Sequence, residues 1–265
     1  MAEPSTIIDK IWQTHVITGR ADGQSLLYID RVLTQENCFH AFDKLRREGR
    51  RVRNPDQAFA FSDHYVPTLD RDKGIANPEI RNMVEMIERD ARETGITLFA
   101  MDDPRHGILH VVGPEQGITL PGLVIAGADS HTSTHGALGA YAFGIGSSEV
   151  THALTTQGLW RPRPNTMRVF VAEALPTGTT AKDLILAIIG KIGAAGAVNH
   201  VIEYAGPGIA ALSIEQRMTI CNMSIEAGAR AGLVAPDETT FAYIEGRPYA
   251  PKGDDWDKAV TYWRT

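Results

Sequence analysis

The chain has little cysteine, fewer positive than negative charges and no long apolar run. Its two cysteines, Cys38 and Cys221, are far apart and form no Cys-x-x-Cys pair. This usage is typical of a reducing cytoplasm, and it excludes a cysteine-ligated metal site built from this chain alone. No stretch approaches the roughly 18 apolar residues that a membrane helix needs, so we expect no membrane contact.

The charge balance and the first residues exclude further classes. The net charge of −6 argues against nucleic acid as the main partner. The one basic cluster, between Arg46 and Arg53, is interpreted as cations at the end of a helix that face solvent. Residues 1–6 lack the basic and apolar segments of a secretion signal, so we expect a cytoplasmic protein.

Strand and helix patterns alternate along a chain long enough for two domains. Short apolar runs predict buried strands at 26–30, 58–62, 97–100 and 123–126, and helices at 78 and about 147 follow such runs. This alternation predicts an α/β fold with a largely parallel sheet covered by helices.

Two prolines in the polar stretch 161–165 predict a boundary between domains 1–166 and 167–265. The second domain is predicted to contain strands at 167–172 and 200–204, a helix at 180–192 capped by Thr180, and a long helix at 213–230 opened by a capping box. The chain ends on an apolar helical stretch, 259–265, without a cap, so we expect the sequence to be interrupted there.

The densest polar cluster, residues 129–136, reads Asp-Ser-His-Thr-Ser-Thr-His-Gly and follows the apolar run 122–127. Ligands of open α/β sheets lie at the carboxyl ends of strands, so this octet predicts a site. Asp63 and His64 also follow a predicted strand, and His110 lies in an apolar, strand-like run. Glu226 is predicted on the long helix, four residues after Asn222 and therefore on the same face.

Each of these groups also has an ordinary interpretation. An Asp-His dipeptide is usually a solvated turn, a lone glutamate is usually a surface residue, and His135, His152 and His200 are left with that interpretation. The groups at 63–64, 110, 129–131 and 226 differ because they lie beside glycines or at strand ends. Together they provide three histidines and three carboxylates, which is the inventory needed to hold imidazoles in chosen tautomers for proton transfer.

Three stretches resemble the aconitase superfamily: Gly107-Ile-Leu-His-Val-Val-Gly-Pro-Glu-Gln-Gly117, the octet, and Phe143-Gly-Ile-Gly146 with Glu149. Within it the chain is most similar to the large subunit of 3-isopropylmalate dehydratase (isopropylmalate isomerase), also at 27–31, 218–228 and 234–241. The resemblance covers nearly the whole chain. It implies a three-layer α/β/α fold with largely parallel sheets, in which two of the family's domains are present.

The resemblance also implies a reaction, in which a hydroxy acid is dehydrated and rehydrated so that its hydroxyl moves between adjacent carbons. For the closest relatives this is 3-isopropylmalate to 2-isopropylmalate, in leucine biosynthesis. A [4Fe–4S] cluster binds the substrate hydroxyl as a Lewis acid. The catalytic base is a serine on a swivelling domain, which in the bacterial dehydratases is a separate small subunit and hence the expected partner of this chain.

Matched motif by motif, the resemblance implies three acid–base pairs: Asp63 with His64, His110 with Asp129, and His131 with Glu226. It implies that Ser130 and His40 contact substrate and that Asn222 lies near the cluster. His40 stands where the family often has a glutamine, so citramalate, homocitrate and maleate-type substrates remain open.

The cluster's three cysteines lie in a third family domain, expected beyond Thr265, and neither cysteine here matches them. We therefore expect no cluster bound to this chain, a partly open site, and no activity by itself. Two alternatives remain. One is a mononuclear metal hydrolase with His64, His110, Asp129 and His131 as ligands. The other is a non-catalytic remnant that only binds a partner subunit.

Overall fold

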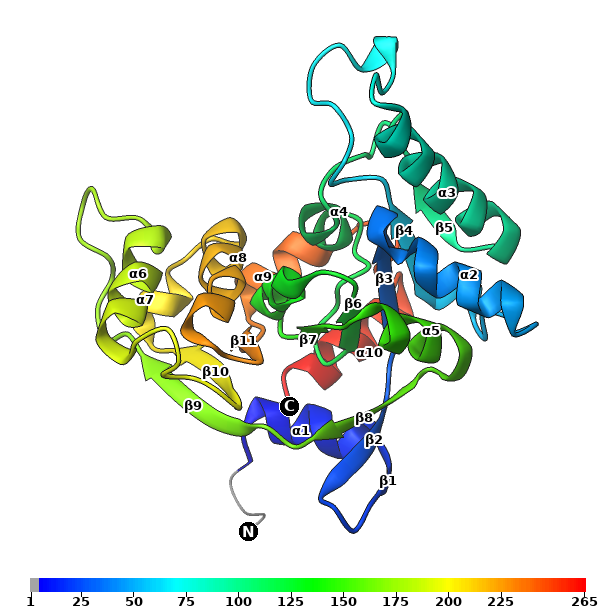
Figure 1. The fold of residues 1–265 in the computed structure, drawn as a ribbon. Coiled ribbons are helices and arrows are strands. Elements are labelled where there is room, and N and C mark those ends of the chain that lie inside the picture. The colour runs from blue at the N-terminus through cyan, green and yellow to red at the C-terminus, as the bar shows by residue number, and fades with distance from the viewer. Residues whose placement is uncertain (1–4) are drawn as a thin grey trace.

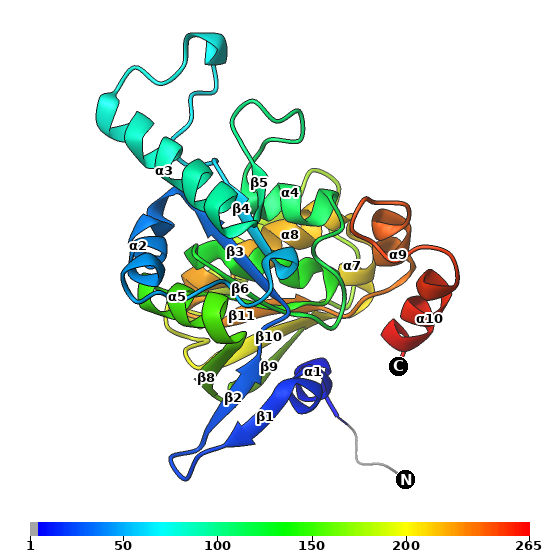
Figure 2. The same ribbon diagram turned by 90° about the vertical axis from the view of Figure 1, so that its right-hand side faces the viewer.

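The computed structural model describes residues 5–265, so residues 1–4, on which the expectation of no secretion signal partly rests, lie outside the described residues. At its centre is a five-stranded parallel sheet in the order β5-β4-β3-β6-β7 (Figures 1 and 2). Its strands are β3 (Arg31–Gln35), β4 (Ala58–Phe61), β5 (Thr97–Phe99), β6 (Val124–Gly127) and β7 (Tyr141–Gly144).

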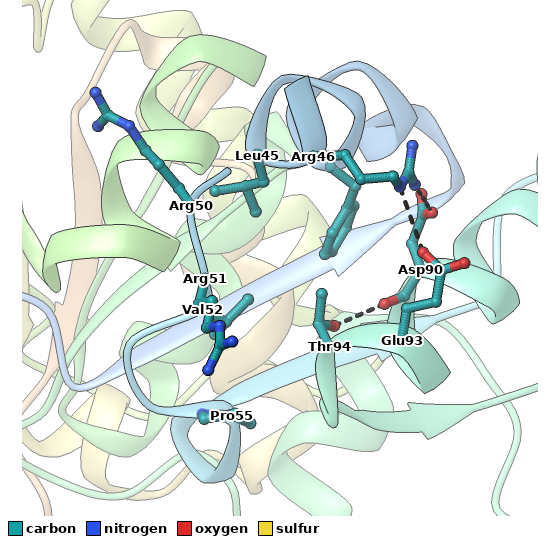
Figure 3. A pocket seen from close by; sticks show the side chains of 10 residues that line it. Leu45, Arg46, Arg50, Arg51, Val52, Pro55, Asp90, Glu93 and Thr94 are labelled. Atoms are coloured by element: carbon teal, nitrogen blue, oxygen red, sulfur yellow. Dashed lines mark hydrogen bonds and ion pairs between the residues drawn. The ribbon is translucent and has the colours of Figure 1, made fainter. Parts of the chain in front are cut away.

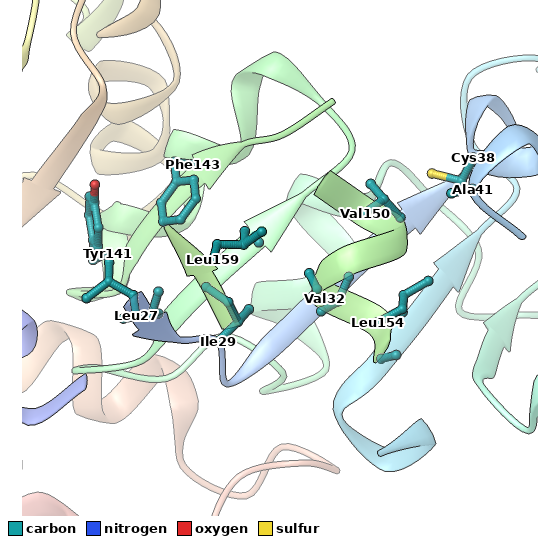
Figure 4. Close-up of a cluster of buried hydrophobic side chains, with 14 of the residues drawn as sticks. Leu27, Ile29, Val32, Cys38, Ala41, Tyr141, Phe143, Val150, Leu154 and Leu159 are labelled. Atoms are coloured by element: carbon teal, nitrogen blue, oxygen red, sulfur yellow. The ribbon is translucent and has the colours of Figure 1, made fainter. Parts of the chain in front are cut away.

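Helices cover both faces of this sheet, because successive residues of its strands point to opposite sides. Val32 packs with α2 (Phe39–Arg47), α3 (Pro78–Thr94) and α5 (Ser147–Thr156) in the cluster drawn in Figure 4. Its neighbour Leu33 packs on the other face with α4 (Leu109–Glu115). The predicted α/β/α fold with parallel strands is confirmed.

A second, three-stranded parallel sheet has the order β11-β10-β9. It consists of β9 (Asn165–Phe170), β10 (His200–Ala205) and β11 (Ala231–Val234), and it packs with α6 (Ala181–Ile192), α8 (Ile214–Asn222) and α9 (Glu238–Ile244). The predicted domain boundary after residue 166 falls inside β9. The division into two domains stays a prediction.

An antiparallel sheet, β1-β2-β8, completes the architecture. It contains β1 (Val16–Gly19), β2 (Gln24–Tyr28) and β8 (Gly158–Pro162), and β8 leads directly into β9 along the lower edge of Figure 1. The remaining helices are α1 (Ile7–His15), α7 (Pro207–Ala210) and α10 (Asp254–Trp263), with short 3₁₀ turns η1 (Glu36–Cys38), η2 (Pro55–Gln57), η3 (Arg71–Lys73), η4 (Ser130–Leu138) and η5 (Ile225–Ala227). No helix within residues 5–265 is long and apolar enough to cross a membrane.

The capping residues in the sequence predicted where helices start more accurately than where they end. Helix α3 starts at the predicted residue 78 and is capped by Asn77, and Thr180 caps α6, as predicted. The predicted long helix at 213–230 is wrong beyond Asn222, where α8 ends. There the Ser224 hydroxyl donates to the carbonyl of Ile220, and the chain turns through η5 and Gly228, which has φ of 79°, into β11.

The basic cluster is largely neutralised by carboxylates. Arg46 pairs with the buried Asp90 and with Glu93 across α2 and α3, and Arg47 pairs with Asp43 at 3.0 Å. A cavity of about 550 Å³ is lined in part by Arg46, Asp90 and Glu93 (Figure 3). Arg46 therefore differs from the prediction that the cluster only faces solvent at the end of a helix, because its ion pairs join α2 to α3.

Candidate active site

The site begins where two strands of the central sheet end. Asp63 follows β4 and Asp129 follows β6, and both strands flank β3 in parallel register. The Asp63 side chain is fully buried. Its Oδ2 accepts the backbone N–H of Leu109 at 2.8 Å, and its Oδ1 lies 2.5 Å from Nδ1 of His64. Asp63 therefore joins the end of β4 to the first turn of α4.

Asp129 connects three histidines. Its Oδ1 lies 2.7 Å from Nε2 of His110 and accepts the backbone N–H of His131 at 2.7 Å. Its Oδ2 forms an ion pair with Nε2 of His64 at 3.2 Å. The hydrogen bond from the His131 backbone arises because Asp129 is the N-cap of η4, in extended backbone conformation.

His110 lies on a helix and not in the strand-like run that the sequence suggested. It occupies the first turn of α4, whose N-terminal backbone N–H is satisfied by Asp63, a contact invisible to local patterns. Behind it, Nδ1 of His110 lies 3.4 Å from Nε2 of the buried His135, and Nδ1 of His135 lies 2.6 Å from the Thr119 hydroxyl.

The third pair joins the octet to the second sheet. Nε2 of His131 lies 3.0 Å from Oε1 of Glu226, and the two side chains are 35% and 45% exposed. Glu226 lies in η5, beyond the end of α8 at Asn222, so the prediction that these two residues share a helix face is wrong. A Cβ at Gly136 would lie 1.8 Å from the carbonyl oxygen of Gly232 in β11, so only glycine lets η4 pack this closely on β11 and bring His131 to Glu226.

All six residues predicted as catalytic thus form one connected network, and among the other three predicted residues only the side chain of Ser130 is hydrogen-bonded to a member of it within residues 5–265. The Ser130 hydroxyl lies 3.0 Å from Nδ1 of His131. The side-chain amide of Asn222 donates to the Thr134 hydroxyl in η4. His40 is exposed in the first turn of α2 with its ring against Phe39, and within residues 5–265 no hydrogen bond or ion pair links its side chain to the six. The roles of all nine residues stay predictions.

The electrostatics of the network favour a cationic His64. The hydrogen bond to Asp63 is the main cause that raises the pKa of His64 from 6.5 to about 9, with burial opposing and the charges of Asp63, Asp129 and Glu36 adding to the rise. Burial raises the pKa of Asp129, but hydrogen bonds from His110 and the His131 backbone outweigh it and hold this pKa well below its usual range. At neutral pH, His64 is therefore a cation beside ionised Asp129.

Two buried groups escaped the sequence reasoning. Glu36, in η1, accepts the backbone N–H groups of His64 and Tyr65 at 3.3 Å each. His135 is fully buried, and burial lowers its pKa well below 6.5, so it is neutral. A carboxylate directly after a strand was the signal available for Glu36, but the strand was predicted at 26–30, whereas β3 ends at Gln35.

Metal ligation is poorly supported by these contacts. Within residues 5–265, the only three histidine, cysteine or carboxylate side chains whose ligand atoms all lie within 4.8 Å of one another are Glu36, Asp63 and His64. The carboxylate oxygens there already accept backbone N–H groups or contact imidazole. The four ligands predicted for a mononuclear metal hydrolase are not among these residues as a set, and the oxygens of Asp129 are already in contact with the imidazoles of His110 and His64.

The cysteines do not fit an iron–sulfur cluster. Cys38 and Cys221 are free and buried. Burial raises the pKa of Cys38 to about 12 and that of Cys221 even further, so both are thiols, whereas cluster iron is bound by thiolates. This chain by itself provides no ligand set for such a cluster.

A cavity of about 410 Å³ is lined by Ser130 and by Ile225, the chain neighbours of His131 and Glu226, but by none of the six network residues. Ile145 and Ile225 give it apolar walls, and the exposed Arg230 places a cation in its lining. The lining therefore combines apolar side chains with one cation.

Comparison with models of known families gives a match over most of the chain. The model of the aconitase family (aconitate hydratase) matches residues 9–265. The matched range contains both parallel sheets and every residue of the acid–base network.

Proposed function

The chain belongs to the aconitase family, and from that premise we propose that it provides the acid–base residues of a hydro-lyase that isomerises 3-isopropylmalate and 2-isopropylmalate in leucine biosynthesis. Family membership supports the hydro-lyase class. The observation that carries the assignment of roles is the position of His64 between the carboxylates of Asp63 and Asp129, with its ring about one third exposed.

His64 is the proton donor in this proposal. Its Nδ1 is fixed at 2.5 Å from Asp63, whereas the 3.2 Å contact of Nε2 with Asp129 is longer, so Nε2 is the end that turns to a substrate. In dehydration the C–O bond breaks, and the leaving hydroxyl takes the Nε2 proton and departs as water. A base removes the proton from the adjacent carbon, and those C–H bonding electrons form the C=C bond. Rehydration reverses these steps with the carbons exchanged, so no oxidant is needed.

His110 and His131 orient water and substrate in this proposal. Asp129 fixes one ring and Glu226 the other, so each imidazole presents a chosen nitrogen. Ser130 and Arg230 are suited to the substrate carboxylates, and Ile145 and Ile225 to its alkyl branch. Citramalate, homocitrate and maleate-type acids are the alternative substrates, since His40 departs from the family's glutamine.

Other parts of the active enzyme lie outside this network. We propose that the base comes from a small swivelling-domain subunit, and that a [4Fe–4S] cluster, which supplies Lewis-acid activation of the hydroxyl, is held by cysteines that are not among residues 1–265. A cytoplasmic location and the division into domains 1–166 and 167–265 complete the proposal.

A substrate panel tests this function. The chain is assembled with the family's cysteine-bearing domain and small subunit, and turnover is measured on 3-isopropylmalate, citramalate, homocitrate and maleate. The highest kcat/KM is expected for 3-isopropylmalate. A preference for another of these acids would change the proposed substrate but keep the hydro-lyase class. No turnover of any of them by a cluster-loaded assembly would overturn that class and favour a non-catalytic remnant.

A further inference from the structure

Glu36 is a buried carboxylate to which the mechanism above assigns no role. It is fully buried, and it follows β3, the strand that lies between β4 and β6. The carboxyl ends of parallel neighbours meet at one edge of a sheet. Glu36 therefore lies at the same edge as Asp63 and Asp129.

Its two oxygens hold the turn that carries His64. Oε2 accepts the backbone N–H of His64 and Oε1 that of Tyr65, each at 3.3 Å. These are the first two backbone donors after Asp63, so one carboxylate spans the turn. A carboxylate oxygen of Glu36 also lies within 4.8 Å of ligand atoms of Asp63 and His64.

The surroundings give Glu36 an electrostatic connection to the imidazole. Within residues 5–265 no lysine or arginine forms an ion pair with Glu36. Burial is the main cause that raises the pKa of Glu36; a hydrogen bond from its own backbone opposes this, the charge of Asp63 adds to the rise, and the backbone hydrogen bonds from Tyr65 and His64 lower it. A buried carboxylate is expensive unless it is paired, and the nearby cation is His64. The charged groups that act on His64 are Asp63, Asp129 and Glu36.

We propose that Glu36 is a positioning residue for the Asp63–His64 pair: it holds the turn that presents the imidazole, and its charge helps to keep that ring protonated. The relevance of this role to catalysis rests on the proposed function. The holding of the turn and the effect on the charge of His64 are properties of the 265-residue chain itself.

The first test is an NMR titration of the His64 ring in the 265-residue chain, with its signal assigned by loss in His64→Gln. Glu36→Gln removes the charge but keeps the size, and we expect it to lower the pKa of His64 by about half a unit to one unit, the scale of one charge a few ångströms away. Glu36→Asp keeps the charge on a shorter side chain and should give a smaller decrease.

Asp90→Asn is the matched control, because Asp90 is also a buried carboxylate but pairs with Arg46 away from the site. It should leave the titration of His64 unchanged. An unchanged pKa of His64 in Glu36→Gln would overturn the proposal, as would a shift of equal size in the Asp90 variant. If Glu36→Gln does not fold, the titration of Glu36→Asp decides: a smaller decrease in the pKa of His64 supports the proposal, and an unchanged pKa overturns it.

The second test uses the assembled enzyme. In Glu36→Gln the alkaline limb of kcat/KM should move to lower pH, and kcat should decrease about threefold or more with little change in KM. Less active protein with an unchanged pH profile would mean a merely structural role and would contradict the proposal. If the assembly turns over no hydroxy acid, the proposed function fails, while the NMR titration still decides the role of Glu36.

Discussion

Replacement of Asp63 by asparagine should remove the main cause of the raised pKa of His64. The substitution preserves shape but removes the charge that lies 2.5 Å from Nδ1 of His64. Asparagine has one acceptor oxygen, so it can serve either the imidazole or the backbone N–H of Leu109, but not both as Asp63 does. The pKa of His64 should therefore fall from about 9 towards 6.5.

The stabilisation that the Asp63–His64 contact gives the folded chain follows from the rise in the pKa of His64. A rise from 6.5 to about 9 is about 2.5 units, and at 1.36 kcal/mol per unit this would be roughly 3.4 kcal/mol. The His64 ring is about a third exposed, so solvent screening reduces the stabilisation to about 1–2 kcal/mol. A pKa near 7 would lower the protonated fraction at pH 8 from about nine tenths to about one tenth.

The effect has a defined pH window. The pKa of His64 in the folded chain lies above its unfolded value of 6.5, so the stabilisation is fully present below about pH 6.5 and is lost as pH rises through about 9. Chemical unfolding at pH 6 and at pH 10 measures the stabilisation, and NMR titration of His64 measures its pKa. A His64 that titrates near 6.5 in the wild-type chain, or near 9 in Asp63→Asn, would refute the reasoning.

Three further predictions concern catalysis, binding and stability. In the assembled enzyme, His64→Ala or Glu226→Gln should lower turnover by about a hundredfold or more, as loss of a positioned acid or its orienting partner commonly does; near-wild-type turnover in both, with the cluster loaded, would contradict the roles. Arg230→Gln should raise KM about tenfold with kcat nearly unchanged, because the cation binds ground state and transition state alike, and steady-state kinetics will show whether kcat falls instead. Asp237→Ala should destabilise the chain by about 3 kcal/mol in urea unfolding, because it leaves the fully buried Arg217 guanidinium without its carboxylate; a loss below about 1 kcal/mol would mean that Arg217 finds another partner.

Those parts of the site that lie at strand ends could be predicted from the sequence. The apolar runs before Asp63 and Asp129 predicted strands, and parallel neighbours bring their carboxyl ends to one edge, so the convergence of these carboxylates followed from pattern and geometry. His131 came with Asp129 in the same octet. Its partner Glu226 was predicted to lie on a helix. The resemblance to the family, and not helical periodicity, paired Glu226 with His131.

The remaining features depend on tertiary contacts that no local pattern encodes. α4 begins where Asp63 accepts a backbone N–H from 46 residues away, so His110 was wrongly taken as part of a strand-like run. α8 ends where Ser224 and Gly228 turn the chain into β11, although the residues of 213–230 fit a longer helix. Glu36 and His135 were missed because each is polar in sequence and buried only by the packing of other elements.

The pH dependence of kcat/KM for 3-isopropylmalate tests the central claim most directly. If His64 donates the proton, activity of the assembled enzyme should be sustained to about pH 9 and then decrease tenfold per pH unit as one proton is lost. In Asp63→Asn the same limb should move to about pH 7. A limb already near pH 6.5 in the wild type, or one that does not move in the variant, would contradict the assignment of His64 as the acid.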